Sequence, residues 1–296
     1  MQAKVKIYKT YIVLLIIVIA LCGFFYILNH NSFEATIIQH NDISGSQAMF
    51  YTIKTKSGDF IVIDGGTVGN AKYVREVIEK HGNRVSTWIL THPHPDHIGA
   101  FNEIYSDPQG IEINNIITID MDYNLYKENA QAWDDFPTFE RFCSLIKDEN
   151  NIQYVHTGDV LNLHGFKMNV YNAYDDTTIL YTKDLANQGS IVFKLCGKKE
   201  SILFTSDVNG EVFSNKIIEQ FGQELRADYL QMGHHGNWSI TKEFATIVQP
   251  TAAFFDAPEW LMDDEKYDTK KNIRMMEDMN AIIYTYESTP NMVILH

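Results

Sequence analysis

Short apolar runs that alternate with polar residues, or continue without a break, dominate the chain after residue 35, as is typical of β-strands. A first group of strand patterns occupies residues 36–40, 49–55, 59–64, 85–90 and 114–120. A second group occupies residues 153–155, 160–163, 167–171, 190–195, 201–206, 227–232, 252–255, 281–286 and 292–295. Helical spacing occurs at residues 71–82, 121–150, 211–222, 241–248 and 270–279. Two strand-rich halves with covering helices predict an α+β fold, a four-layer αββα sandwich formed by one domain over residues 36–296.

The N-terminal pattern is different, because residues 11–28 form an apolar run without a single charge. At ~1.5 Å per residue such a helix nearly spans a hydrocarbon core of ~30 Å. The lysines in residues 1–10 favour a short cytoplasmic tail, so we expect a single-pass anchor in the cell membrane and an extracytoplasmic domain. A cleaved signal peptide is the main alternative, and a buried core helix is a weaker one. A lipoprotein cleavage site before Cys22 is disfavoured because Leu21 is bulky.

Composition narrows the possible partners. The formal net charge is −14, and the first thirty residues contain three lysines and no acid, so the remainder is more acidic than the whole. An acidic surface repels polyanions, which argues against general binding of nucleic acids or anionic membranes. The only cysteines beyond the apolar run, Cys143 and Cys196, could form one disulfide or remain thiols.

One strand pattern runs directly into the sequence THPHPDH, which places His92, His94, Asp96 and His97 on a short loop. Residues two apart point to the same side of an extended chain, so His92 and His94 can reach one ion together. Beyond a tight corner, Asp96 and His97 can reach a second ion. Imidazole and carboxylate ligands suit Zn²⁺, and also Fe²⁺ or Mn²⁺. The alternative, a solvated histidine-rich loop, is disfavoured by this spacing.

Three further strand patterns end in metal-binding residue types, as the completion of two metal sites requires. The segments VIDGG, LFTSDVNG and MGHHGN deliver Asp64, Asp207, and His234 with His235. Small residues follow each of them and let the backbone turn. Taken singly, an aspartate after a strand is often an ordinary turn residue. Together with THPHPDH, the three segments predict one site.

These motifs resemble those of the metallo-β-lactamase superfamily. THPHPDHIGA resembles its highly specific HxHxDH signature, and VIDGG, LFTSD and HHGN occur in that superfamily's order. MGHHGNWS and NQGSIVFKL are most similar to the branch containing the hydrolase domain of the DNA-uptake channel ComEC and the cell-wall phosphorylcholine esterases. The resemblance extends over residues 36–296 and implies a sandwich fold and a hydrolase with two divalent metal ions, foremost Zn²⁺.

The resemblance also implies a role for each site residue. The expected ligands are His92 and His94 for the first ion, Asp96, His97 and His235 for the second, and Asp207 bridging both, with His234 completing the first site or binding substrate. Asp64 is expected to orient a ligand histidine. Many superfamily members carry a further histidine where this chain has Asn187. Because asparagine is a poor zinc ligand, either His234 substitutes for it or the first site is weaker and more open.

Two such ions ~3.5–4 Å apart would share a water molecule, lower its pKa and stabilise charge on the substrate. Asp96 is expected to accept a hydrogen bond from the resulting hydroxide, and His234 or water to protonate the leaving group. We therefore expect a metal-dependent hydrolase, with phosphodiester bonds of a small-molecule or cell-wall substrate favoured, of choline-phosphate or nucleotide type.

Three alternatives remain at this level. The first is a DNA-processing nuclease related to competence, which the acidic charge disfavours. The second is a hydrolase of β-lactams or other esters, which HHGN and Asn187 fit poorly. The third is an inactive anchored binding module, against which the intact HxHxDH turn and Asp207 argue.

The aromatic residues of 121–150 offer a hypothesis for specificity. They are Tyr123, Tyr126, Trp133, Phe136, Phe139 and Phe142, with Asp134 and Asp135 among them. An aromatic and acidic wall can hold a quaternary ammonium group such as choline by cation–π attraction. The spacing of the three phenylalanines favours a different role, packing of one helix face onto the sandwich.

Overall fold

The computed structural model describes residues 16–19, 33–286 and 290–296. The expected cytoplasmic tail, residues 1–10, and nearly all of the expected anchor, residues 11–28, lie outside the described residues. Within those that are described, no helix is long and apolar enough to cross a membrane. The anchor and the extracytoplasmic location therefore stay predictions.

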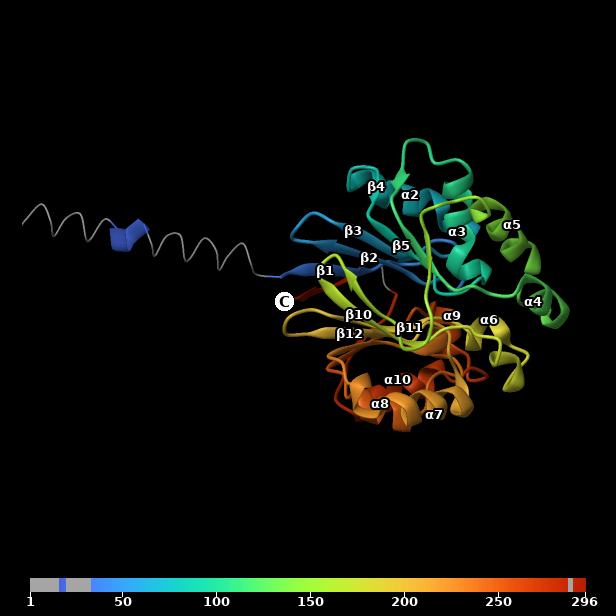
Figure 1. The fold of residues 1–296 in the computed structure, drawn as a ribbon. Helices are drawn as coiled ribbons and strands as arrows, with labels where there is room; N and C mark the ends of the chain where they lie inside the picture. The colour runs from blue at the N-terminus through green and yellow to red at the C-terminus, as the bar shows by residue number, and fades with distance from the viewer. Residues whose placement is uncertain (1–15, 20–32, 287–289) are drawn as a thin grey trace, which may run out of the picture.

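Two seven-stranded sheets form the centre of the domain (Figure 1). The first sheet contains, in spatial order, β16 (Asn291–Leu295), β1 (Ala35–Gln39), β2 (Phe50–Thr55), β3 (Phe60–Asp64), β5 (Thr87–Ile89), β7 (Ile116–Thr118) and β8 (Ile152–Tyr154). The second contains β15 (Ile282–Tyr284), β14 (Ala252–Phe254), β13 (Tyr229–Gln231), β12 (Ser201–Phe204), β11 (Val192–Cys196), β10 (Phe166–Asn172) and β9 (Val160–Leu163). A separate pair joins β4 (Arg84–Val85) to β6 (Glu112–Ile113).

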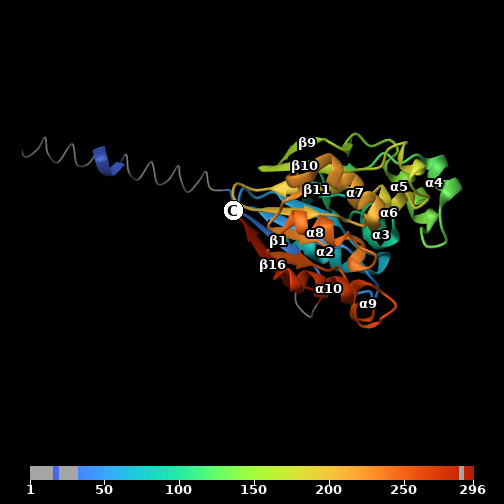
Figure 2. The same ribbon diagram turned by 90° about the horizontal axis from the view of Figure 1, so that it is seen from below.

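Helices cover the outer faces of both sheets (Figures 1 and 2). The first sheet is covered by α2 (Ala71–Lys80), α3 (Pro95–Ser106) and α5 (Phe136–Ile146), and the second by α7 (Gly210–Phe221), α8 (Lys242–Val248) and α10 (Thr269–Asp278). Shorter helices are α4 (Tyr123–Asn129), α6 (Leu185–Gln188) and α9 (Glu259–Asp263), and the 3₁₀ turns are η1 (Val68–Asn70), η2 (Thr178–Leu180), η3 (Gly222–Leu225) and η4 (Gly233–Gly236). The predicted α+β fold is confirmed, with layers in the order helix, sheet, sheet, helix.

The burial of the strands explains their sequence patterns. The edge-proximal strand β1 alternates between buried and half-buried residues, whereas β3, in the middle of its sheet, is buried throughout. β3 pairs in parallel with β5, and β13 pairs in parallel with both β12 and β14. The carboxyl ends of the parallel strands in each sheet therefore meet at one edge, and the loops that follow them carry the predicted metal ligands.

The aromatic stretch 121–150 differs from the single helical segment that its pattern predicts. It forms α4 and α5, separated by a turn in which Asp135 adopts a left-handed conformation with φ of 45°. Phe139 and Phe142 are buried in the core beside α3, as the packing interpretation expects. Trp133, in the turn, is 64% exposed and is free for another role.

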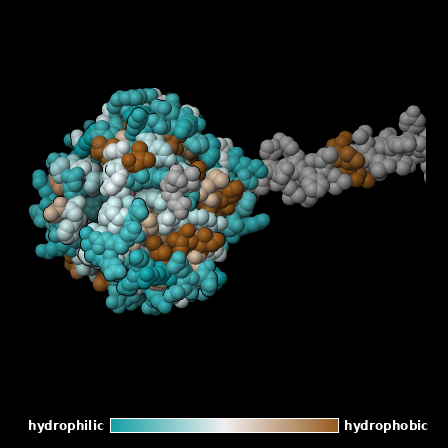
Figure 3. All heavy atoms as spheres, turned by 180° about the vertical axis from the view of Figure 1, so that it is seen from behind, coloured by the Kyte–Doolittle hydropathy of each residue, from teal (hydrophilic) through white to brown (hydrophobic). Residues whose placement is uncertain are grey.

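The described surface is mostly hydrophilic, and its apolar residues form separate patches, as Figure 3 shows for the side seen from behind. Exposed apolar side chains on the edge strands include Ile282 of β15, and Met292 and Ile294 of β16. Cys143 and Cys196 are free thiols, so the disulfide that the sequence allowed is absent.

Candidate metal centre

The HxHxDH sequence leaves β5 and enters helix α3 at once. His94 is the extended N-cap residue, with φ of −69° and ψ of 150°, and Pro95 is the first helical residue. Asp96 and His97 therefore lie in the first turn of α3, and the expectation that all four residues occupy a loop is wrong for these two. The fixed φ of proline suits the first helical position, and a carboxylate there is stabilised by the helix dipole.

Ligand-type atoms from three separate loops meet beside this turn. The first group joins His92, His97 and Asp207, whose potential ligand atoms all lie within 4.8 Å of one another. Asp207 Oδ2 lies 3.7 Å from His92 Nε2 and 3.4 Å from His97 Nε2. The residues that the sequence places 110 positions apart thus converge on one point.

A second group joins Asp96, His97 and His235 within the same 4.8 Å limit. His235 Nε2 lies 3.2 Å from Asp96 Oδ2 and 3.5 Å from Asp207 Oδ2. Asp207 therefore faces ligand atoms of both groups, as a bridging carboxylate must. All four of these side chains are buried.

In three of the histidines, one ring nitrogen makes a hydrogen bond that fixes the orientation of the ring. Asp64 Oδ2 lies 2.7 Å from His97 Nδ1, and the backbone oxygen of Asp256 lies 2.9 Å from His235 Nδ1. Both contacts leave Nε2 to face the site. His94 differs from these two histidines, because its Nε2, and not its Nδ1, contacts a partner, Asp134 Oδ1, at 2.9 Å. Its Nδ1 is therefore the nitrogen left without this contact. Such outer partners fix the tautomer and the ring orientation of metal-binding histidines.

Several buried polar atoms at this point have no hydrogen-bond partner among the described residues: His92 Nε2, His97 Nε2, His235 Nε2 and Asp207 Oδ1. Buried polar atoms in folded proteins are nearly always paired, so such a cluster requires a further occupant. Imidazole nitrogens and carboxylate oxygens are the ligands that Zn²⁺ and related divalent ions take. The donor set therefore fits divalent metal ions, and its two ligand groups fit two such ions.

Three predicted residues lie near the centre but outside both ligand groups. His94 belongs to neither group, although its ring centre is 4.8 Å from that of His92. His234 Nδ1 contacts the backbone oxygen of Asn237 at 2.8 Å. Asn187 donates from Nδ2 to Asp184, and its buried Oδ1 is unpaired among the described residues. The expectation that the first site is weaker where Asn187 replaces histidine therefore stays a prediction.

Backbone strain is concentrated in the loops that carry these residues. Asp64, Ser206, His234, His235 and Trp238 all have φ between 45° and 56°, where non-glycine residues are uncommon. Such conformations cost about 1–3 kcal/mol each and persist where surrounding contacts enforce them, often at functional sites. Close packing adds to this, since a Cβ at Gly233 would lie 2.4 Å from the backbone oxygen of Val208.

Burial and mutual charge set the protonation of the metal-free cluster. Burial lowers the pKa of His92 well below its usual value, and the neighbouring His97 adds to this. Burial also opposes protonation of His97 and His235, but Asp207 and other carboxylates outweigh it, raising the pKa of His97 strongly and that of His235 to about 10. Conversely, His97 and His235 overcome the effect of burial on Asp207 and hold its pKa well below the usual range.

Metal binding should therefore strengthen as the pH rises. The raised pKa values of His97 and His235 favour their protonated forms in the metal-free protein, and a metal ion must displace those protons. Their raised pKa values stabilise the metal-free fold fully below about pH 6.5, and that contribution is lost as the pH rises towards the folded-state pKa. Thermal unfolding with Zn²⁺ and with a chelator, at about pH 6 and about pH 8, should show the larger stabilisation by Zn²⁺ at the higher pH. An equal or smaller stabilisation at the higher pH would contradict this assignment of the protons.

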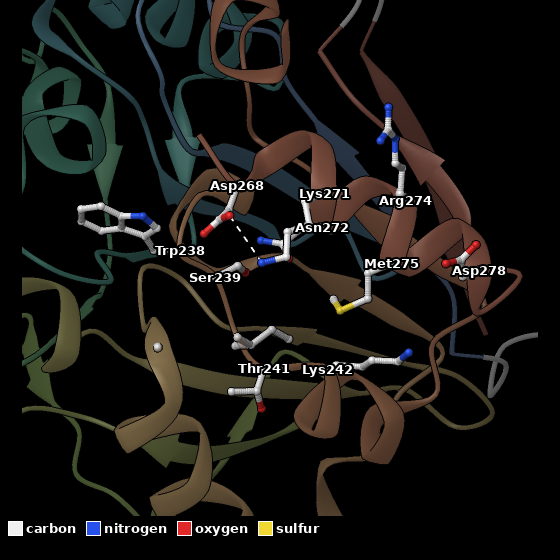
Figure 4. Close-up of a pocket in the computed structure, with 12 residues that line it drawn as sticks. Trp238, Ser239, Thr241, Lys242, Asp268, Lys271, Asn272, Arg274, Met275 and Asp278 are labelled. Atoms are coloured by element: carbon white, nitrogen blue, oxygen red, sulfur yellow. Dashed lines mark ion pairs between the residues drawn. The ribbon is translucent and has the colours of Figure 1, made fainter. Parts of the chain in front are cut away.

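A cavity of about 280 Å³ opens over the centre. Its walls come from six separate parts of the chain and include Gln47, His94, Asp96, Trp133, Asp184, Asn187, Asp207, Asn209, His234 and Trp238. A larger groove of about 750 Å³ between α8 and α10 shares only Trp238 with it (Figure 4). We assign the chemistry to the smaller cavity, because Asp96 and Asp207 of the two ligand groups line that cavity and no predicted ligand lines the groove.

The sequence interpretation missed three residues that contact the candidate ligands. Asp134 binds His94, Asp256 binds His235 through its backbone, and Gln47 Nε2 donates to Asp96 Oδ2 at 3.0 Å. Asp134 and Asp256 are fully buried, and Gln47 is half-buried. No short motif surrounds these residues, and only their approach in three dimensions reveals them.

The comparisons with known proteins agree with this geometry. Residues 44–110, which contain the HxHxDH turn, match the family model described as the metallo-β-lactamase superfamily. The fold is similar to that of YhfI from Bacillus subtilis, a metallo-β-lactamase fold protein, with a TM-score of 0.53 and 11% identity over 90% of this chain and 100% of that one. The chain has the metallo-β-lactamase fold. The predicted sandwich fold is thereby confirmed, and the superfamily model matches the segment that carries the predicted signature. The narrower resemblance to the branch of ComEC and the phosphorylcholine esterases stays a prediction.

Two solved structures whose described reactions differ are also similar to this chain. Igni18, a metallo hydrolase from Ignicoccus hospitalis, has a TM-score of 0.52 and 12% identity over 88% of this chain and 99% of that one. CmlA from Streptomyces venezuelae, a diiron β-hydroxylase, has a TM-score of 0.54 and 10% identity over 88% of this chain and 54% of that one. No curated protein sequence matches the chain. Because these two similar structures are described as a hydrolase and a hydroxylase, the reaction of this chain must be argued from the site.

Proposed function

We propose that the protein is a metal-dependent hydrolase that cleaves phosphodiester bonds at a centre formed by two divalent metal ions. The observation that carries this proposal is the meeting of unpaired His92, His97 and His235 nitrogens with Asp207 in one buried cluster. When bound, a pair of divalent ions activates water and stabilises negative charge on the reacting group. The site needs no serine or cysteine nucleophile beside the ions. A diiron oxygenase is the competing chemistry, and its products would distinguish it.

The side chains around the centre suit this reaction. Asp207 and Asp96 supply carboxylate oxygens to the ligand groups, and Gln47 donates a hydrogen bond to Asp96 and lines the cavity where substrate would lie. His234 also lines the cavity, and burial lowers its pKa. A neutral His234 whose Nδ1 donates to the oxygen of Asn237 presents Nε2 as an acceptor. We therefore assign protonation of the leaving group to solvent water, and contact with substrate or water to His234.

Another part of the cavity wall favours a cationic alcohol as part of the substrate. It carries the exposed indoles of Trp133 and Trp238 and the carboxylate of Asp184, and none of the described lysines or arginines lines the cavity. Metal ions attract the phosphate, whereas indole faces and a carboxylate attract a quaternary ammonium group. A zwitterionic phosphodiester such as a choline phosphodiester can bind the metal ions through its phosphate and this part of the wall through its ammonium group. An oligonucleotide has no cationic group for the indoles and the carboxylate to bind.

Trp133→Ala should therefore raise the KM for p-nitrophenyl phosphorylcholine. The KM for bis-p-nitrophenyl phosphate, which carries no cationic group, should stay nearly unchanged. A cation–π contact of about 0.5–2 kcal/mol corresponds to an increase of about 2- to 30-fold. Trp260→Ala is the matched control, because Trp260 is partly exposed but does not line this cavity. An equal increase for both substrates would show that Trp133 has no part in selecting the cation.

A substrate panel tests the proposed reaction. The purified protein is assayed on bis-p-nitrophenyl phosphate, p-nitrophenyl phosphorylcholine, single-stranded DNA and a cephalosporin, before chelation, after chelation and after Zn²⁺, Mn²⁺ or Fe²⁺ is restored. We expect hydrolysis of the two phosphodiesters, loss on chelation and recovery with metal. Full activity after complete metal removal would refute metal dependence, and preferential cleavage of DNA or of the cephalosporin would refute the proposed substrate.

The proposed setting is the outer face of the cell membrane, with a small-molecule or cell-wall phosphodiester as substrate. The start of β1, where the chain enters the domain, lies at the end opposite to α6, which carries Asn187 of the cavity wall (Figure 1). A membrane anchor before β1 would leave the cavity facing away from the bilayer. Fractionation of cells expressing the full chain, with protease protection, tests this: recovery in the soluble fraction would contradict the anchor.

A further inference from the structure

Asp256 occupies an unusual place, at the end of β14 where the two sheets meet. Its side chain is fully buried and accepts hydrogen bonds from both sheets. Oδ1 accepts from Gln39 Nε2 and from the hydroxyl of Tyr51, each at 2.7 Å, and these residues belong to β1 and β2 of the first sheet. Oδ2 accepts from Gln231 Nε2 of β13, in the second sheet, at 3.1 Å.

The backbone of Asp256 contacts one candidate ligand directly. Its oxygen lies 2.9 Å from His235 Nδ1, and this contact turns His235 Nε2 towards Asp96 and Asp207. The position of the backbone depends on the side chain, because Gln231 holds Oδ2 while Gln39 and Tyr51 share Oδ1. A buried carboxylate so restrained is an anchor point for the His235 loop.

The side chain reaches a second candidate ligand through Gln231. While Gln231 Nε2 donates to Asp256, its Oε1 accepts from the backbone N–H groups of Thr205 and Ser206, at 3.0 and 2.8 Å. Ser206 has φ of 48° and directly precedes Asp207. The same amide therefore holds the left-handed turn that presents Asp207 to the centre.

We propose that Asp256 is a positioning residue for the metal centre, which fixes His235 through its backbone and Asp207 through Gln231. The inference rests on the proposed metal centre and assigns a role there to a carboxylate that touches neither substrate nor metal. It explains why an acceptor-only group is needed, since three donors point at it and an amide would turn an N–H towards one of them.

The test compares the Zn²⁺ affinity of four proteins by competition with a chromophoric chelator: wild type, Asp256→Asn, Gln231→Met and Tyr51→Phe. Asp256→Asn and Gln231→Met each disrupt the hydrogen bond between Asp256 and Gln231, which connects Asp256 to the Asp207 turn. The test therefore remains decisive if only one of these two variants folds. Tyr51→Phe is the matched control, because it removes one of the two donors to Oδ1, where Gln39 still donates, and leaves the Oδ2 contact with Gln231 intact. Circular dichroism establishes the folded fraction of each protein.

We expect Asp256→Asn and Gln231→Met to weaken binding of the tightest Zn²⁺ ion by about 10- to 100-fold, as the loss of outer partners does elsewhere. Tyr51→Phe should lower the melting temperature and keep the wild-type Zn²⁺ affinity. Equal affinities in all four folded proteins, or an equal loss in Tyr51→Phe, would overturn the positioning role and leave the proposed function intact. A wild-type protein that binds no metal would instead refute the proposed function.

Discussion

Asp207→Asn should lower kcat/KM for bis-p-nitrophenyl phosphate by more than about 100-fold, beyond the range expected for an outer partner of a metal ligand. The reason is its position between the two ligand groups, with Oδ2 3.4 to 3.7 Å from the Nε2 atoms of three histidines. An amide oxygen is a poorer ligand and carries no charge to offset two divalent ions. The measurement is steady-state kinetics at saturating Zn²⁺, together with the metal content after dialysis.

Asp228→Asn is the control for that experiment. Asp228 also borders the second sheet and accepts a backbone hydrogen bond, from Ser201 at 2.8 Å, but it lies outside the candidate centre. We expect near wild-type kinetics from Asp228→Asn. Retention of both activity and metal content by Asp207→Asn would show that Asp207 does not bridge the ions.

The second large effect should follow from Asp64→Asn. Asp64 is completely buried and accepts three hydrogen bonds, from the backbone and hydroxyl of Thr91 and from His97 Nδ1, at 2.7 to 2.8 Å. An asparagine of the same shape must turn an N–H towards one of these donors. We expect a loss of about 1–3 kcal/mol in the free energy of unfolding, and a Zn²⁺ affinity lower by about 10- to 100-fold.

Asp59→Asn gives the matched comparison, at the other end of β3. Asp59 contacts His164 at 3.1 Å, as Asp64 contacts His97, but about a third of its side chain is exposed and no candidate ligand is near. Urea unfolding of both variants measures the free energy of unfolding, and chelator competition measures the Zn²⁺ affinity. Similar Zn²⁺ affinities for Asp59→Asn and Asp64→Asn would refute the orienting role of Asp64.

The strands and most helices of this fold can be predicted from the sequence, because apolar periodicity reports which face is buried. The HxHxDH turn and the strand-end residues Asp64, Asp207 and His235 are also visible, since strand, ligand type and small residues follow in a fixed order. Helix α3 was not expected, because prolines and histidines hide a helix start that Pro95 in fact favours.

Other features depend on contacts that no local pattern encodes. Asp134 lies in an acidic aromatic stretch and looks like a surface residue, yet the turn between α4 and α5 buries it against His94. Asp256 follows an ordinary apolar strand, and its role depends on Gln39, which lies more than 200 positions earlier and pairs with it across the two sheets. Such residues become recognisable only when the packing of the layers is known.

A crystal structure of the protein grown with millimolar Zn²⁺, with anomalous data at the zinc edge, tests the central claim most directly. We predict anomalous peaks between the His92–His97 turn, Asp207 and His235, with a pair of ions ~3.5–4 Å apart and the ion at Asp96, His97 and His235 at the higher occupancy. Zinc bound only elsewhere on the protein, with these side chains still unliganded, would contradict the account.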